Sequence, residues 1–159
     1  MNVSDVATRV RRTFGDEDSI QIQDADIIRW VNHAQEQIVL ENEGLMEATG
    51  TAASVANQKT YTLPADLSVL RSLSFQGFHL KAINLNEFNE RVNGYHAPAN
   101  LNPYGPGVPE YYTIWNNEVW LYPYPESSIA DAISIFYIKH PVAVVNLSDD
   151  LSLPLQYHN

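Results

Sequence analysis

The chain contains 159 residues, which is enough for one domain of ordinary size or for two small lobes with a buried core. Its 19 acidic and 9 basic residues give a net charge of −10, which argues against a surface that clamps nucleic acid through phosphate contacts. Because cysteine is absent, disulfides, thiolate metal sites and cysteine nucleophiles are excluded.

The first predicted element is a helix from about Ser4 to Phe14. Its apolar residues Val6, Val10 and Phe14 are spaced four residues apart, as on one face of a helix. Ser4 is a favourable N-cap residue, and Gly15 follows at the position where many helices end.

Three arginines, Arg9, Arg11 and Arg12, occupy the polar side of this helix just before an acidic run at residues 16–18. Local charge pairing is the simpler interpretation of these cations, and a phosphate site is the alternative. Residues 15–23 then connect to a second helix, and a connection of this length allows the two helices to pack as an antiparallel hairpin.

The longest predicted helix covers Asp24 to Gly44. Asp24 is expected to cap its first turn, and Gly44 is expected to supply the left-handed residue that commonly ends a helix. The opposite, polar face includes Arg29, Asn32 and Glu36 and is available to solvent or to a neighbouring subunit. The apolar face is recognised by residues that recur at steps of three and four: Ile27, Val31, Ala34 and Ile38, with Ile28 and Gln35 beside them.

After Gly50 the hydrophobic period changes from 3.6 to 2, which predicts a β-rich part. Strands are expected at Lys59–Leu63 and at Leu67–Phe75. A turn at Gln76–Gly77 then leads into a returning strand at Phe78–Ile83, which completes a predicted hairpin.

A short helix is predicted among the strands at Asn84–Val92, because Asn84 and Glu87 form a cap-and-box pattern. Residues 93–109 follow, and their prolines and glycines predict that regular structure does not persist there. Loops of this length usually have a use, so we expect this one to be flexible or to be held against a partner.

Three more strands are predicted in the C-terminal third. Glu110–Trp115 and Glu118–Tyr122 flank a two-residue turn at Asn116–Asn117, since asparagine tolerates positive φ. The third strand, Ala132–Ile138, is almost entirely apolar and is expected at the centre of a sheet.

Together these elements predict an α+β fold. An N-terminal antiparallel helical hairpin is expected to pack with a mainly antiparallel β lobe that carries a short helix and a long Pro/Gly loop. We assign residues 1–50 to the helical lobe and residues 51–159 to the β-rich lobe, with the extended loop at 93–109 and a C-terminal arm at 142–159.

Local signatures of catalysis are missing from the sequence. It contains no phosphate-binding loop, dinucleotide fingerprint, nucleophile elbow or zinc helix, and no two of its 5 histidines have the spacing of one helix face. We therefore expect no enzymatic activity, no cofactor and no metal site.

Aromatic residues are concentrated between residues 95 and 137. They could form a platform for a ligand, so a carbohydrate- or peptide-binding module is the alternative function. Alternate side chains of a hairpin face opposite ways, so half of these rings are expected in the core. The candidate platform residues are Tyr111, Tyr112, Trp115, Trp120, Tyr122 and Tyr124.

The N-terminus lacks the apolar stretch of a secretory signal, and no apolar run approaches the roughly 20 residues needed to cross a bilayer. We therefore expect a soluble protein that is made in a cytoplasm and has no membrane partner.

Seven segments carry a resemblance to a known family: FGD at 14–16, DADIIRWVNHAQEQI at 24–38, KTYTLPADL at 59–67, VPEYYTI at 108–114, VWLYPYPE at 119–126, IFYIKHP at 135–141 and LSLPLQYHN at 151–159. In their order and spread over nearly the whole chain, these segments resemble the head-to-tail adaptor proteins of tailed bacteriophages, in the group that includes tail tubular protein A of T7-like podoviruses. Proteins of that group continue from such a C-terminal motif into a helix, which this sequence does not include.

The resemblance implies a structural protein of the virion neck, between capsid and tail. It implies a ring, usually of twelve copies, that joins the portal to the tail or to a stopper or nozzle protein and lines the DNA channel during genome retention and ejection. DNA is then expected to pass without specific binding, which the negative net charge suits.

Two sets of contact residues are predicted for such a protein. Contacts between subunits are expected on the polar side of the long helix, at Arg29, Asn32 and Glu36. Contacts with the portal or tail are expected in the loop and the C-terminal arm, at Tyr95, Asn102, Tyr104, Pro106, Leu153, Leu155 and Tyr157.

Overall fold

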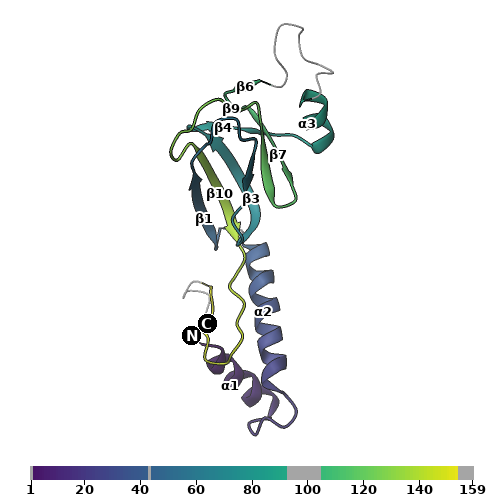
Figure 1. The fold of residues 1–159 in the computed structure, drawn as a ribbon. Helices are drawn as coiled ribbons and strands as arrows, with labels where there is room; N and C mark the ends of the chain where they lie inside the picture. Colours follow the sequence, from purple (N-terminus) through teal and green to yellow (C-terminus); the bar gives the residue numbers. More distant parts are fainter. Residues whose placement is uncertain (1, 43, 93–104, 154–159) are drawn as a thin grey trace. The chain divides into compact units, whose positions relative to one another are not determined.

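A computed structural model describes residues 2–42, 44–92 and 105–153 of the chain. The described residues form three helices and ten strands in a mixed α+β arrangement, in which an N-terminal helical pair precedes a β lobe (Figure 1). This confirms the predicted fold class. The elements are α1 (Val3–Phe14), α2 (Asp24–Glu41), β1 (Glu47–Ala52), β2 (Thr60–Thr62), β3 (Leu67–Phe75), β4 (Phe78–His79), β5 (Lys81–Ala82), α3 (Leu85–Val92), β6 (Pro106–Gly107), β7 (Tyr111–Trp115), β8 (Glu118–Tyr122), β9 (Tyr124–Pro125) and β10 (Ile133–Lys139).

The contacts within the chain divide it into two compact units. Unit 1 contains residues Met1–Glu47 and Ile138–Asn159, and unit 2 contains Ala48–Tyr137. This division differs from the predicted lobes 1–50 and 51–159, because the C-terminal residues belong with the helices and not with the strands. The hydrogen bonds responsible are described below.

Helix α1 begins one residue earlier than predicted. Asn2 is its N-cap, and a capping box joins Asn2 to Asp5: the Asn2 side chain accepts from the Asp5 amide at 3.1 Å, while the Asp5 carboxylate accepts from the Asn2 amide at 3.2 Å. Ser4, the predicted cap, lies inside the first turn. The predicted stop is confirmed, since Gly15 has a φ of 69° and closes the helix in the left-handed conformation.

Helix α2 ends at Glu41, short of the predicted stop at Gly44. Its C-cap is Asn42, whose amide donates to the Ile38 carbonyl at 3.0 Å. The predicted cap at the other end is also wrong, because Gln23 is the N-cap and makes no side-chain cap bond. The Asp24 carboxylate is bound by Arg11 instead.

The buried face of α2 consists of residues four apart, Ile27, Val31, Gln35 and Val39. Of the residues predicted there, Ala34 is exposed. This face is set by the parts of the chain that cover it, which are α1 and residues 144–152. The core of unit 1 is formed by Val3, Ala7, Ile27, Val31 and Val144, with Val6, Ile22, Ile28, Leu147 and Leu151 packed against it.

Unit 2 is built from two four-stranded sheets and one small pair. The first sheet has the order β1-β10-β3-β4, so that β10 lies between β1 and β3 (Figure 1). The central position predicted for this apolar strand is therefore confirmed. The second sheet has the order β2-β8-β7-β5, and β6 pairs with β9.

Both predicted two-residue turns are present. Gln76 and Gly77 have φ values of 49° and 82°, and Asn116 and Asn117 have φ values of 50° and 59°. Two successive residues with positive φ match the twist of the flanking antiparallel strands. The hairpins β3–β4 and β7–β8 follow from these turns.

The returning strand of the first hairpin is shorter than predicted. Only Phe78–His79 pairs with β3, and Lys81–Ala82 then pairs in parallel with β7. The region 93–109 also contains regular structure that was not predicted, because Pro106–Gly107 pairs in parallel with Tyr124–Pro125.

The core of unit 2 contains side chains from both four-stranded sheets. The buried core residues are Tyr61, Leu63, Leu73, Phe75, Leu80, Val119, Leu121, Ala132, Ile133, Ile135 and Tyr137.

Helix α3 begins as predicted, because the Asn84 side chain accepts from the Glu87 amide at 2.8 Å.

Candidate functional site

The C-terminal segment is held against α2 by two side chains. The Asn32 amide nitrogen donates to the Val144 carbonyl at 3.0 Å, and its oxygen accepts from the Val144 amide at 2.9 Å. The Gln35 side-chain oxygen accepts from both the amide and the hydroxyl of Ser152, each at 2.9 Å. We call these two residues the clamp, because they hold residues 142–153 to the helical unit.

The start of α1 fixes the same segment from the other side. The Val3 amide donates to the Asp149 carbonyl at 3.0 Å, and the Ser4 amide donates to the Leu147 carbonyl at 2.8 Å. These amides belong to the first turn of a helix and have no partner within it. Binding them to the C-terminal segment satisfies both groups and makes that segment part of unit 1.

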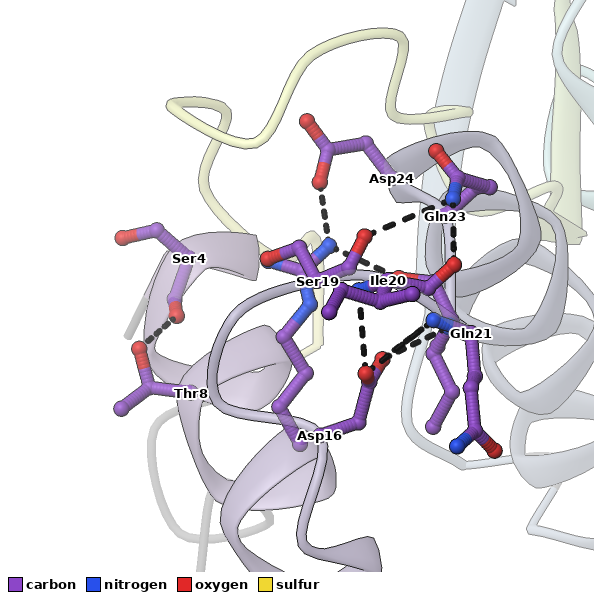
Figure 2. Close-up of polar contacts among 10 residues, drawn as sticks. Ser4, Thr8, Asp16, Ser19, Ile20, Gln21, Gln23 and Asp24 are labelled. Atoms are coloured by element: carbon purple, nitrogen blue, oxygen red, sulfur yellow. Dashed lines mark hydrogen bonds and ion pairs between the residues drawn. The ribbon is translucent and has the colours of Figure 1, made fainter.

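The connection between α1 and α2 is organised around one buried carboxylate, Asp16. It accepts from the amides of Ile20 at 3.0 Å, Gln21 at 3.0 and 3.1 Å, and Ile22 at 2.7 Å (Figure 2). These backbone hydrogen bonds, that from Ile22 above all, hold the pKa of Asp16 below its ordinary value of 3.8. Arg11 spans the same connection, donating to the Ile22 carbonyl at 3.1 Å and pairing with Asp24.

The residues predicted to contact neighbouring subunits do not share one environment. Arg29 is exposed and pairs with Asp26 at 2.8 Å within the same helix, and Glu36 is exposed. Asn32 differs, since both polar groups of its side chain bond to Val144 inside the chain. Helix α2 also carries two exposed large apolar side chains: Leu40, 62% exposed, lies on the same face as Arg29 and Glu36, and Trp30, 48% exposed, lies about 100° around the helix from Arg29.

Two of the residues predicted to contact the portal or tail lie in the described part of the chain. Pro106 is exposed in β6, and Leu153 is 6% exposed in unit 1. The remaining five predicted residues lie outside the described residues: Tyr95, Asn102, Tyr104, Leu155 and Tyr157. Pro154 lies outside them as well.

Most of the tyrosine-rich hairpin is used for packing. Phe88 of α3 meets Trp120 and Tyr122 edge to face, with ring centroids 6.0 and 6.1 Å apart. The Lys59 ammonium lies 5.2 Å from the centre of the Trp120 ring. Trp115, near the hairpin tip, remains 54% exposed. Trp115 is therefore the one exposed ring among the six candidate platform residues, and the other five are partly buried.

An apolar hollow of about 270 Å³ lies in unit 2 between residues of both four-stranded sheets. No carboxylate, imidazole or cationic side chain lines it, so it offers no pair of groups for acid–base work. Within residues 2–42, 44–92 and 105–153, no three His, Cys, Asp or Glu side chains gather as a metal site would require. The lining residues are Gly50, Thr51, Ala52, Tyr61, Thr62, Leu63, Pro64, Val119, Ile133 and Ile135.

Sequence reasoning did not find the clamp or the buried role of Asp16. One signal was available for Gln35, which occupies a position of the apolar face although it is polar. A buried amide needs hydrogen-bond partners, so such a residue predicts a segment packed across the helix. Nothing in the local sequence identifies that segment as residues 142–153.

Among the described helices, none combines the length and the apolar composition that crossing a lipid bilayer requires. No curated protein matches the sequence at a significant level. A family model does match: the family described as SU10 adaptor protein covers residues 1–159. The adaptors of this family are structural proteins of the phage head-to-tail connection, so the family match confirms the predicted phage adaptor but not the group of tail tubular protein A. By this match along its whole length, the chain belongs to the SU10 adaptor protein family.

Proposed function

We propose that this adaptor forms a homo-oligomeric ring in the virion neck, between the portal and the tail. The observation that carries the proposal is the family match over residues 1–159, which makes the chain a phage head-to-tail adaptor. A ring of twelve copies and a place near the tail tubular protein A group of T7-like podoviruses are the finer parts of this proposal. Its partners are other copies of itself, the portal protein, and a tail, stopper or nozzle protein.

The outer face of α2 is the proposed contact between subunits. It combines exposed charges at Arg29 and Glu36 with the exposed apolar side chain of Leu40, and Trp30 is exposed on the adjoining side of the helix. Interfaces between proteins commonly have this composition, with aromatic and aliphatic anchors among polar groups. Asn32, the third predicted contact residue, supports this face from within by holding the C-terminal segment.

Contacts with the portal or the tail are proposed in two regions, the loop at 93–109 and the C-terminal arm at 142–159. The region 93–109 provides Tyr95, Asn102, Tyr104 and Pro106, and the C-terminal arm provides Leu155 and Tyr157. Leu153, the third residue predicted in the arm, is buried in unit 1 and supports the arm from within. Contacts of this kind depend on complementary shape and require no catalytic group or cofactor.

The proposed role toward DNA is passive. With a net charge of −10, the chain lacks the excess of lysine and arginine that binds phosphates. A channel lined by such a protein repels DNA weakly and lets it slide during packaging and ejection. Binding of free DNA is therefore expected to be negligible.

Native mass spectrometry of the adaptor mixed with the portal protein of the same virus tests the proposal. The expected result is one complex that contains the portal ring and several adaptor copies. The adaptor measured alone provides the reference for self-association. A mixture in which the two proteins stay separate at micromolar concentration would overturn the proposed function.

A further inference from the structure

We propose that the arginine-bearing outer face of α1 in one copy binds the outer face of α2 in the next copy, with Arg12 facing Glu36. This inference rests on the proposed ring and names the two surfaces that meet in it. It also gives a use to Arg9 and Arg12, which form no ion pair within the described residues.

The outer face of α1 is positively charged and open. Thr8, Arg9 and Arg12 are all exposed on the side away from the buried Val3 and Ala7. Their spacing of one, three and four residues keeps them on neighbouring positions of one helix face. Of the three arginines in this helix, Arg11 donates a hydrogen bond to the Ile22 carbonyl and forms an ion pair with Asp24. Within the described part of the chain, Arg9 and Arg12 take part in no ion pair, although local pairing was the simpler prediction.

A shallow polar hollow of about 190 Å³ lies beside these cations. Thr8, Arg11, Arg12 and Glu17 line it. The Arg11 Nε atom is buried and has no hydrogen-bond partner. Two of its four lining residues are arginines and one is a glutamate, so a carboxylate side chain of another copy can form charge-assisted hydrogen bonds with the two guanidinium groups.

The matching acidic group lies on α2. Glu36 is exposed and forms no ion pair within the described residues, whereas Arg29 on the same face is already paired with Asp26. Leu40 lies one turn after Glu36, so exposed apolar area adjoins the acid. The charge of one face is therefore complementary to the charge of the other.

The two faces are arranged for head-to-tail contact. At about 100° per residue, Arg29, Glu36 and Leu40 project from roughly the opposite side of α2 to the buried Ile27 and Val31. The α1 face points away from α2, because Val3 and Ala7 are buried in the core that the two helices share. Each copy thus presents two different surfaces that look away from each other, as a heterologous interface requires.

Cross-linking tests this pairing directly, and the absence of native cysteine makes the background clean. A double variant, Arg12→Cys with Glu36→Cys, is assembled with the portal and treated with a short bis-maleimide reagent that replaces the two long side chains. The expected result is a ladder of linked adaptor dimers, trimers and larger species. Arg12→Cys paired with Glu126→Cys, an exposed position in unit 2, is the matched control and should give no ladder.

The outcomes separate this inference from the proposed function. A portal–adaptor complex without the 12–36 ladder would overturn the inference and leave the proposed function in place. A dimer formed by Arg12→Cys alone would also overturn it, because the face would then meet itself. Failure of the unmodified adaptor to assemble with the portal would overturn both.

Charge reversal provides an independent readout. Arg12→Glu and Glu36→Arg are each expected to weaken assembly about tenfold, since like charges then face each other. The combined variant restores opposite charges and should recover most of the affinity of the original protein. If the combined variant assembles no better than either single variant, Arg12 and Glu36 do not meet.

Discussion

Asn32 and Val144 are joined by two hydrogen bonds although 112 residues separate them in the chain. One side-chain amide satisfies both the N–H and the C=O of a single residue, in the way that a neighbouring strand would. The polar side of α2 therefore has two uses: Asn32 holds the C-terminal segment, while Arg29 and Glu36 remain at the surface.

Replacing this amide should loosen the C-terminal segment. Asn32→Ala removes both bonds to Val144 and is expected to lower the free energy of unfolding by roughly 1–3 kcal/mol, because two backbone groups lose their partner. Urea unfolding followed by circular dichroism measures the change. Gln37→Ala, an exposed position of the same helix, should change stability by less than about 0.5 kcal/mol. Equal effects of the two substitutions would show that Asn32 is not a clamp.

Stability should decrease in acid because of two carboxylates. Backbone hydrogen bonds lower the folded-state pKa of Asp16 and of Asp149, whose strongest donors are the Ile22 and Val145 amides respectively. A lowered pKa contributes stability that is complete above the unfolded value of about 4 and is lost as the pH falls through the folded value. We therefore expect the thermal unfolding midpoint to stay nearly constant from pH 6 to about pH 4 and to decrease as the pH is lowered from about 4 to 2.

Asp16→Asn provides the comparison for this pH series. It should be less stable at pH 6 and should lose less stability on acidification, because it has no carboxylate to protonate. Asp18→Asn removes an exposed charge from the same connection and controls for net charge. An Asp16→Asn variant with the same pH slope as the original protein would contradict the assignment.

The packing of α3 on β8 depends on one ring. Phe88 is 3% exposed and lies edge to face against Trp120 and Tyr122. Phe88→Ala should lower the free energy of unfolding by roughly 3–5 kcal/mol, because it opens a cavity that the neighbouring rings cannot fill. Thermal unfolding measures the loss. Phe78→Ala, at a side chain that is 73% exposed, is the matched control and should have little effect.

The packing of Trp120 also bears on the alternative function as a carbohydrate- or peptide-binding module. With Phe88 and Lys59 against its ring, Trp120 is not free to stack on a sugar. Tryptophan fluorescence should therefore stay unchanged when oligosaccharides or short peptides are titrated to millimolar concentration. A saturable change that Trp115→Ala abolishes would favour the alternative over a purely structural role.

The features that the sequence predicted correctly are those that depend on neighbouring residues. The turns at Gln76–Gly77 and Asn116–Asn117 require positive φ, and glycine and asparagine adopt it at low cost. The Asn84 cap of α3 and the Gly15 stop of α1 are likewise set within four residues. The strongly apolar β10 could be placed inside a sheet for the same local reason.

The features that were missed depend on residues far apart in the chain. Helix α2 buries Gln35 because Ser152 of the C-terminal segment packs against it, and no local pattern predicts that segment. The change of partner between β4, which pairs with β3, and β5, which pairs with β7, also depends on residues far apart, since Lys81 pairs with Tyr111.

Electron cryo-microscopy of the virion neck shows whether this chain forms the proposed ring. Particles that carry a tag on this chain are compared with untagged particles. We expect a closed ring of tagged copies directly between the portal and the tail, around a continuous DNA channel. Tag density elsewhere in the particle, or a neck that lacks this chain, would refute the proposed ring.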